Sequence, residues 1–286
     1  EWRTDREGWD PFGWFHDPAS DVAGSAQVLF DPGLESAYSD QLVLGYERAL
    51  WPRSSVELSY VNKKTRGLFE DTCDGNVPVP GGSDSCDFYV MLNLPQLRRD
   101  YEAWIVRFES RTLDWLTVLA SYTWSESKGD QYSLGFANDY DEYPWHWENR
   151  YGYLDNHYRH VLKVNGYFLL PWDVVIGFNA AWLSAWRWTP QADSFDIPEM
   201  IRGTYFVEPR GSREGYDSSV LDLQISKGIP IGATRLELLV SVLNVFSTED
   251  VSGVCERVRG CGEFELGEPT RWKKPRRWEV GLRLTF

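Results

Sequence analysis

The chain ends in the segment Trp278-Glu279-Val280-Gly281-Leu282-Arg283-Leu284-Thr285-Phe286, in which apolar and polar or small residues alternate up to the last position. Because successive side chains of a β-strand point to opposite faces, this pattern predicts a strand with one apolar and one polar face. The apolar face suits lipid, and the polar face suits a water-filled lumen. A strand of a soluble β-sandwich gives the same alternation, so the remaining sequence is needed to distinguish the two folds.

Eight segments upstream show the same alternation and are predicted strands. They span residues 41–47, 55–60, 103–109, 116–124, 162–168, 174–182, 221–226 and 236–243. We therefore predict an all-β fold, the portion of a transmembrane antiparallel up-and-down β-barrel with about nine strands. Residues 1–40 are expected to form an extracellular N-terminal segment, and residues 41–286 the barrel strands.

The links between these strands alternate between short and long. Short links lie at 51–54, 111–114, 171–173 and 228–232, and long links at about 65–100, 126–158, 187–215 and 247–275. Outer-membrane barrels have tight periplasmic turns at one end and long extracellular loops at the other, whereas a sandwich has no reason to sort its links. The pattern therefore predicts the outer membrane of a Gram-negative bacterium, with Phe286 at the periplasmic rim.

Large aromatic residues lie at the predicted strand ends, where hydrocarbon meets the lipid headgroups in a membrane protein. Trp51, Trp115 and Trp172 lie beside short links. The aromatic residues next to long links are Tyr122, Trp124, Trp182, Trp186 and Trp188. Two aromatic belts are therefore expected.

An odd number of strands does not suit a closed bacterial barrel, because single-chain barrels have even strand numbers. Unpaired strand edges in lipid cost several kcal/mol for each unsatisfied group. We therefore expect further strands to pair with the edges, or a tenth strand to come from residues 22–30. The N-terminal residues do not form a signal peptide, so a leader is expected to be missing or removed.

Composition excludes several classes of function. The 286 residues carry a net charge of -14 and contain no apolar run long enough for a transmembrane helix, so neither nucleic acid nor a helical anchor is expected. No phosphate-binding loop or H-E-x-x-H motif is present. We expect no enzyme, no catalytic residue, no cofactor and no bound metal; a barrel phospholipase that uses Ser and one of the four histidines is a minor alternative.

The four cysteines form two close pairs, Cys73 with Cys86 and Cys255 with Cys261, in polar stretches. This spacing favours two local disulfides. In the chain-entropy model, closing a loop of about 15 residues is worth roughly 3 kcal/mol. Disulfides persist in oxidising compartments such as the periplasm and the cell surface. A zinc site is the alternative, but neither pair has the CxxC spacing typical of structural zinc.

Two sets of side chains are candidate functional residues. Polar residues predicted to face the lumen are Arg107, Lys163, Asp222, Gln224, Glu237 and Arg283. A possible extracellular ligand loop contains Asp139, Asp141, Glu142, Trp145 and Trp147. Carboxylates suit hard cations, and indole faces suit sugar rings and cations, although a solvated loop or a lipopolysaccharide contact is the interpretation we favour for that loop.

Several of these segments together resemble the C-terminal barrel portion of a TonB-dependent outer-membrane receptor of the Oar-like group. The resemblance covers residues 31–286, in the order of the family. The segments that carry it are Asp31-Pro32-Gly33-Leu34, Tyr38 to Arg48, Leu119-Ala120-Ser121-Tyr122-Thr123-Trp124-Ser125, Arg159 to Gly166, and Leu236 to Phe246. The last strand fits the family's barrel-assembly signal at Glu279, Gly281, Leu284 and Phe286.

This resemblance implies the last nine of about 22 strands, which agrees with the number counted from periodicity. The N-terminal plug, its TonB-contacting segment and the other strands are then absent from these residues. The implied partners are outer-membrane lipid and lipopolysaccharide, the missing plug and strands, the barrel-assembly machinery, and the TonB system through the absent N-terminal part. The predicted lumen residues would contact the plug.

The implied function is TonB-dependent import of a large or scarce ligand, which could be a siderophore, a vitamin, a glycan, a peptide or a protein. Without the plug and the TonB-contacting segment, these residues alone would not carry out gated import. Two alternatives remain open at this point. One is a passive small barrel or surface-structural protein that closes with an N-terminal strand, and the other is a secreted Trp-rich sandwich that binds carbohydrate.

Overall fold

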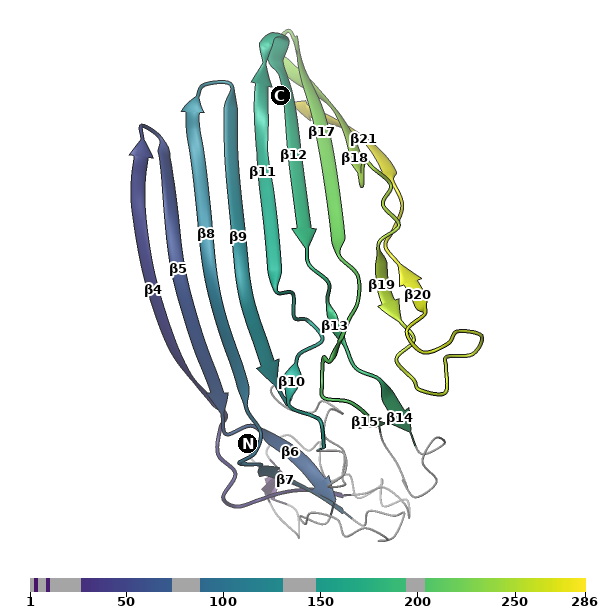
Figure 1. Cartoon of the computed structure of the whole chain (residues 1–286). Coiled ribbons are helices and arrows are strands. Elements are labelled where there is room, and N and C mark those ends of the chain that lie inside the picture. Colours follow the sequence, from purple (N-terminus) through teal and green to yellow (C-terminus); the bar gives the residue numbers. More distant parts are fainter. Residues whose placement is uncertain (1–2, 5–8, 11–26, 74–87, 131–147, 194–203) are drawn as a thin grey trace.

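The computed structural model describes residues 3–4, 9–10, 27–73, 88–130, 148–193 and 204–286. Nine long strands form one curved antiparallel sheet in which each strand pairs with the next one in the chain (Figure 1). They are β4 (Tyr38–Trp51), β5 (Ser54–Arg66), β8 (Arg99–Leu113), β9 (Leu116–Gly129), β11 (His160–Leu170), β12 (Val174–Leu183), β17 (Ser218–Ile231), β18 (Thr234–Leu243) and β21 (Arg277–Thr285). The predicted all-β fold and its nine strands are confirmed, and β4 and β21 are the two edges of the described sheet.

Short connections lie at one end of the sheet and long connections at the other (Figure 1). The C-terminus lies at the short-turn end, and the strand formed by residues 27–30 lies at the opposite end, where it pairs with residues 88–91. Strands β11, β12, β18 and β21 have 9 to 11 residues. That length suits a tilted strand that crosses a bilayer core.

The short turns are tighter than the sequence predicts. Residues 228–232 are a predicted link, yet Gly228 to Ile231 continue the ladder with β18, and Pro230 lies opposite Arg235. The apolar alternation ends before the backbone pairing does, because an antiparallel hairpin needs only two turn residues. Gly232, with a φ of 61°, supplies one of them.

Neighbouring turns are joined by ion pairs at the surface. Arg53 contacts Asp114 at 2.8 Å between the β4–β5 and β8–β9 turns. Arg235 contacts Asp173 at 2.6 Å and so joins the β17–β18 turn to the single-turn segment η2 (Pro171–Asp173). Such exposed pairs contribute at most about 1 kcal/mol each to stability. The backbone hydrogen bonds between the strands therefore remain the main interaction that holds this end of the sheet together.

The register separates the side chains into two faces. One row of directly opposed residues is Leu116, Phe168, Ile176, Ile225, Val240 and Val280. Because opposed residues point to the same face, this row forms a continuous apolar band across six strands. Val280 and Leu282 on the same face are 78% and 70% exposed, which is costly in water and suits lipid.

Small sheets occupy the long-loop end. The N-terminal strand β3 (Gln27–Phe30) pairs in parallel with β7 (Phe88–Asn93), and β7 pairs with β6 (Phe69–Cys73). The segment considered as a tenth barrel strand therefore belongs to a loop sheet, separate from β4 and β21. The other short strands are β1 (Arg3–Thr4), β2 (Trp9–Asp10), β10 (Gly152–Tyr153), β13 (Arg187–Trp188), β14 (Gln191–Asp193), β15 (Thr204–Phe206), β16 (Arg213–Glu214), β19 (Val251–Val254) and β20 (Pro269–Trp272).

Aromatic residues at the short-turn end are exposed, as expected for a membrane belt: Trp51 is 46%, Trp115 49% and Trp172 83% exposed. At the loop end one expectation is wrong. Trp188 is only 6% exposed, its indole nitrogen donates to the Glu214 carbonyl at 3.1 Å, and Arg213 lies over its ring. Trp188 therefore belongs to the packed core of the loops.

Within the described residues, no helix has the length and apolar character needed to cross a membrane.

Candidate functional site

All six predicted lumen residues lie on the polar face of the sheet. Ser121 lies opposite Arg107 on one side and opposite Lys163 on the other, so these two cations share a face. Asp222 and Gln224 are on the same face of β17, and Glu237 lies directly opposite Arg283. Their predicted contact with a plug stays a prediction, but their shared face is a property of the fold.

Most of these polar side chains are already paired within the sheet. Arg107 contacts Glu57 at 2.8 Å, and Arg283 contacts Glu237 at 3.2 Å. Gln224 donates to the Ser241 hydroxyl at 3.0 Å. Lys163 has no ion-pair partner among the residues that the structure describes, so it is the predicted lumen cation most available to a molecule inside the barrel.

The predicted barrel-assembly signal lies on the edge strand β21. Glu279 and Gly281 lie opposite Ser241 and Leu239 on the polar face, and Leu284 lies opposite Leu236 on the apolar face. Phe286 directly follows the strand and is 97% exposed at the short-turn end. The role of these four residues in barrel assembly stays a prediction.

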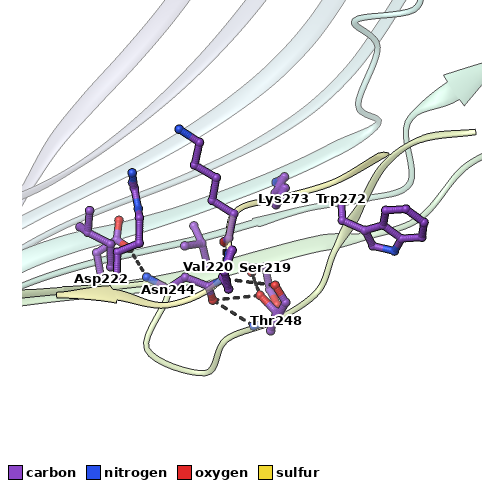
Figure 2. A pocket seen from close by; sticks show the side chains of 11 residues that line it. Ser219, Val220, Asp222, Asn244, Thr248, Trp272 and Lys273 are labelled. Atoms are coloured by element: carbon purple, nitrogen blue, oxygen red, sulfur yellow. Dashed lines mark hydrogen bonds between the residues drawn. The ribbon is translucent and has the colours of Figure 1, made fainter. Parts of the chain in front are cut away.

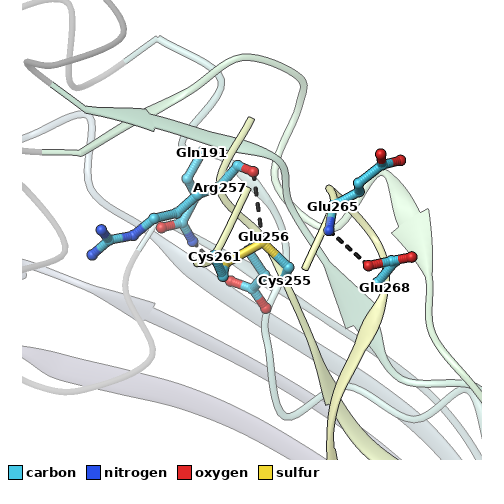
Figure 3. The surroundings of a disulfide bond; sticks show 7 residues. All are labelled: Gln191, Cys255, Glu256, Arg257, Cys261, Glu265 and Glu268. Carbon is cyan, nitrogen blue, oxygen red and sulfur yellow. Dashed lines mark hydrogen bonds between the residues drawn. A yellow bond between two sulfur atoms is a disulfide. The ribbon is translucent and has the colours of Figure 1, made fainter. Parts of the chain in front are cut away.

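The loop between β19 and β20 is closed by a disulfide (Figure 3). Cys255 and Cys261 are bonded, with their Cα atoms 5.7 Å apart, and the Cys255 side chain is fully buried. Cys86 lies outside the described residues, so the Cys73–Cys86 disulfide stays a prediction. The possible ligand loop also lies outside them, with Asp139, Asp141, Glu142, Trp145 and Trp147.

Glu256 joins two of the long loops. The Gln191 amide side chain donates to the Glu256 carboxylate at 3.0 Å, and the Gln191 backbone N–H donates to the Glu256 carbonyl at 2.7 Å (Figure 3). Burial raises the pKa of the Glu256 carboxyl to about 7, the charge of Asp155 adds to the increase, and Arg271 opposes it. Sequence reasoning missed this site, because Gln191 and Glu256 are 65 positions apart.

This raised pKa predicts a pH dependence of the loop junction. Between the ordinary carboxyl pKa of about 4 and about 7, the folded state binds more protons than the unfolded state, so stability falls as pH rises. Glu256→Gln keeps the hydrogen bond and removes the charge, and it should stabilise the junction by about 1 to 3 kcal/mol at pH 8. At pH 4 the variant and the wild type should be equal.

Hydrogen exchange of the amides in 251–258, corrected for intrinsic rates, measures this difference. Glu265→Gln, a matched change at an exposed position of the same loop, should leave the exchange unchanged at both pH values. Equal hydrogen-exchange protection of the wild type and Glu256→Gln at pH 8 would show that the charge of Glu256 does not destabilise the loop junction.

His157 is the histidine that packs between the loops. It is 1% exposed and stacks on Tyr153 with ring centroids 4.6 Å apart, and its Nδ1 accepts the Ser127 backbone N–H at 3.3 Å. Burial lowers its pKa to about 4, with the positive charges of Arg159 and Arg187 adding to the decrease. The ring is therefore neutral near pH 7 and contributes packing. Within the described part of the chain, no cluster of His, Cys, Asp or Glu is arranged to hold a metal ion.

A cavity of about 380 Å³ lies at the loop end of β17, β18 and β21 (Figure 2). Asn244 and the basic residues Lys273, Lys274 and Arg277 line it. The sequence interpretation above missed this site. A usable signal was present in Lys273-Lys274-Pro275-Arg276-Arg277, which places four cations within five residues of a chain whose net charge is -14.

Comparisons with known proteins agree with this geometry. A family model described as the outer membrane beta barrel domain matches residues 9–191. A comparison with curated protein sequences gave no match. The outer membrane transporter YddB from Escherichia coli has 13% identity and a TM-score of 0.62 over 91% of this chain and 34% of its own. The FrpB iron transporter from Neisseria meningitidis has 11% identity and a TM-score of 0.56 over 90% and 32%.

The pyoverdine outer membrane receptor FpvA from Pseudomonas aeruginosa has 13% identity and a TM-score of 0.52, covering 88% of this chain and 30% of its own. The chain therefore spans about a third of the length of these structures. At such identities the likeness concerns the fold, and at that level the resemblance to receptor barrels is confirmed. The chain belongs to the outer membrane β-barrel domain family and is a protein of the Gram-negative outer membrane.

Proposed function

We propose that the chain forms part of the barrel of an outer-membrane receptor that imports a large or scarce ligand with energy supplied through TonB. The observation that carries this proposal is the nine-strand meander with one apolar face, one polar face and all long loops at one end. The same sheet occurs in the outer-membrane transporter and receptor structures that it resembles. Siderophores, vitamins, glycans, peptides and proteins are the candidate ligands.

The free edges of the sheet support a larger assembly. The outward-facing backbone groups of β4 and β21 need partners in lipid, because each unsatisfied group there costs several kcal/mol. Further barrel strands would satisfy them. A plug inside the completed barrel would face the polar row that includes Lys163, Arg283 and Asp222.

The contact surfaces follow from the same geometry. The apolar band would contact lipid and the acyl chains of lipopolysaccharide, and the barrel-assembly machinery would bind β21. The passive small barrel that closes with an N-terminal strand has less support, because β3 pairs with β7 in a loop sheet. No chemistry of bond making or breaking is needed for the proposed role.

Uptake by cells that express the complete gene product tests this function. The probes are radiolabelled ferric complexes from spent culture medium, radiolabelled cyanocobalamin and a radiolabelled maltodextrin, each offered with and without a proton uncoupler. We expect saturable accumulation of one probe that stops with the uncoupler and in a host without TonB. Uncoupler-independent entry of a small solute such as nitrocefin, with none of the three probes accumulated, would instead support a passive pore.

A further inference from the structure

The cavity at the loop end of β17, β18 and β21 is built around one buried side chain. Asn244 is 8% exposed and has a φ of 53°, a left-handed conformation that asparagine adopts more readily than most residues. Its backbone N–H donates to the Asp222 carboxylate at 2.8 Å, which anchors the end of β18 to β17. Figure 2 shows Asn244 between Asp222 and Thr248.

The Asn244 amide also fixes the segment that enters β21. Its Nδ2 donates to the carbonyls of Thr248 and Lys274, both at 3.1 Å, and its Oδ1 accepts the Thr248 N–H at 3.1 Å. The Thr248 hydroxyl donates to the Ser219 carbonyl at 3.0 Å. The backbone at Lys274 is therefore held in place before any ligand arrives.

The side chains around this frame are basic. Lys273, Lys274 and Arg277 line the cavity, and Asp222 is the only acidic lining residue in the described chain. Both Asp222 carboxylate oxygens already accept hydrogen bonds, from the Asn244 N–H and from Asn179 at 3.5 Å. The cavity thus combines three cations with one occupied carboxylate.

These cations lack the carboxylate partners that several arginines of the sheet have. Arg53, Arg66, Arg107, Arg235 and Arg283 each contact a carboxylate within 3.2 Å. No such partner exists among the described residues for Lys273, Lys274, Arg276 or Arg277, although acidic residues outnumber basic ones by 43 to 29 in the sequence. Like-charged side chains that line one cavity repel one another, and an anion bound between them relieves that repulsion.

We propose that this cavity is an oxyanion-binding site that takes a phosphate-bearing group. A guanidinium binds phosphate oxygens in a fork, and the lysines supply additional charge, so Arg277 and Lys274 are the expected contacts. Asn244 is a positioning residue, since it holds the Lys274 backbone. The cavity lies at the loop end, where a soluble phosphate compound or the phosphate of an outer-leaflet headgroup arrives. This site is independent of whether the protein imports a ligand.

Calorimetric titration of the complete gene product in neutral detergent with inorganic pyrophosphate tests the proposal. Lys274→Gln and Arg277→Gln should each weaken binding about tenfold, because each removes one charge-assisted contact. Arg111→Gln removes the same charge from an exposed residue at the short-turn end and should leave the affinity unchanged. A rise in salt from about 20 to about 200 mM should weaken binding to the wild type.

Asn244→Ala tests preorganisation, because it leaves every charge in place. It should weaken pyrophosphate binding several-fold while the salt dependence stays that of the wild type. Heat-modifiable migration on a detergent gel shows that each variant is folded, and the exposed single variant Lys274→Gln keeps the test decisive if another variant fails to fold. Absence of binding at low salt, or wild-type affinity in both Lys274→Gln and Arg277→Gln, overturns the proposal.

A second arm identifies the source of the phosphate. The protein is placed in bilayer discs with lipid A that carries both phosphates or with dephosphorylated lipid A, and the pyrophosphate titration is repeated. Weaker pyrophosphate binding only with phosphorylated lipid A supports the headgroup as the occupant. Equal binding in both discs supports a soluble phosphate compound. In either case Arg277→Gln should weaken pyrophosphate binding about tenfold, as it does in detergent.

Discussion

Replacement of Phe286 by Asp, or its deletion, is expected to lower the amount of folded protein in the outer membrane by about tenfold or more. A tenfold change in the ratio of assembled to unassembled protein corresponds to ~1.4 kcal/mol. Phe286 follows β21 and is 97% exposed at the short-turn end, so it has few contacts whose loss would unfold a finished sheet. We expect Phe286 to act before folding, because it is the terminal aromatic residue of the predicted assembly signal. An acidic residue at position 286 would also place charge at the membrane interface.

Phe246→Asp provides the matched control. Phe246 is 71% exposed and follows β18 at the loop end, so the same substitution places the same charge on an exposed aromatic position away from the signal. Outer-membrane fractions are analysed for heat-modifiable migration, which reports the folded barrel. Wild-type amounts of folded Phe286→Asp protein, or an equal loss in Phe246→Asp, would remove the support for a terminal signal.

The strands could be predicted because lipid and water impose opposite demands on neighbouring positions. In β18, Leu236, Leu238 and Val240 face one side and Glu237 and Ser241 face the other, and this alternation needs no knowledge of distant residues. Strand ends were less predictable. β9 continues through polar residues to Gly129, where backbone pairing with β8 persists after the apolar signal has ended.

The loop end could not be predicted in the same way, because its contacts join residues that are far apart in sequence. Asn244 meets the Lys274 carbonyl across 30 positions, and neither residue carries a pattern that indicates the other. Trp188 shows the same limit: an aromatic residue after a strand suggested a membrane belt, but Arg213 and Glu214 from the other side of that loop bury it. The basic composition of 273–277 was visible, whereas the cavity that makes it a site was not.

The second large effect concerns the face assigned to lipid. Val240→Arg should destabilise the protein folded in lipid vesicles by about 2 to 4 kcal/mol, because it places a cation near the middle of a membrane strand on the lipid side. Val240 lies between Ile225 and Val280 in register, so the apolar row offers the guanidinium no acceptor. The free energy of unfolding from urea titration in vesicles measures the change.

Ser241→Arg is the control one residue further along β18. Ser241 lies between Gln224 and Glu279 on the polar face, where a guanidinium meets water and a carboxylate, so this variant should remain within about 1 kcal/mol of the wild type. Lys227 is a cation on the apolar side, and it lies near the short-turn end and donates to the Trp172 carbonyl. A cation at the end of a strand can therefore reach the membrane interface. An arginine at position 240 lies several residues from the strand end, so its guanidinium would remain within the apolar region. Equal stability of Val240→Arg and Ser241→Arg would therefore mean that both faces meet water, and the membrane-spanning assignment of β18 would fail with it.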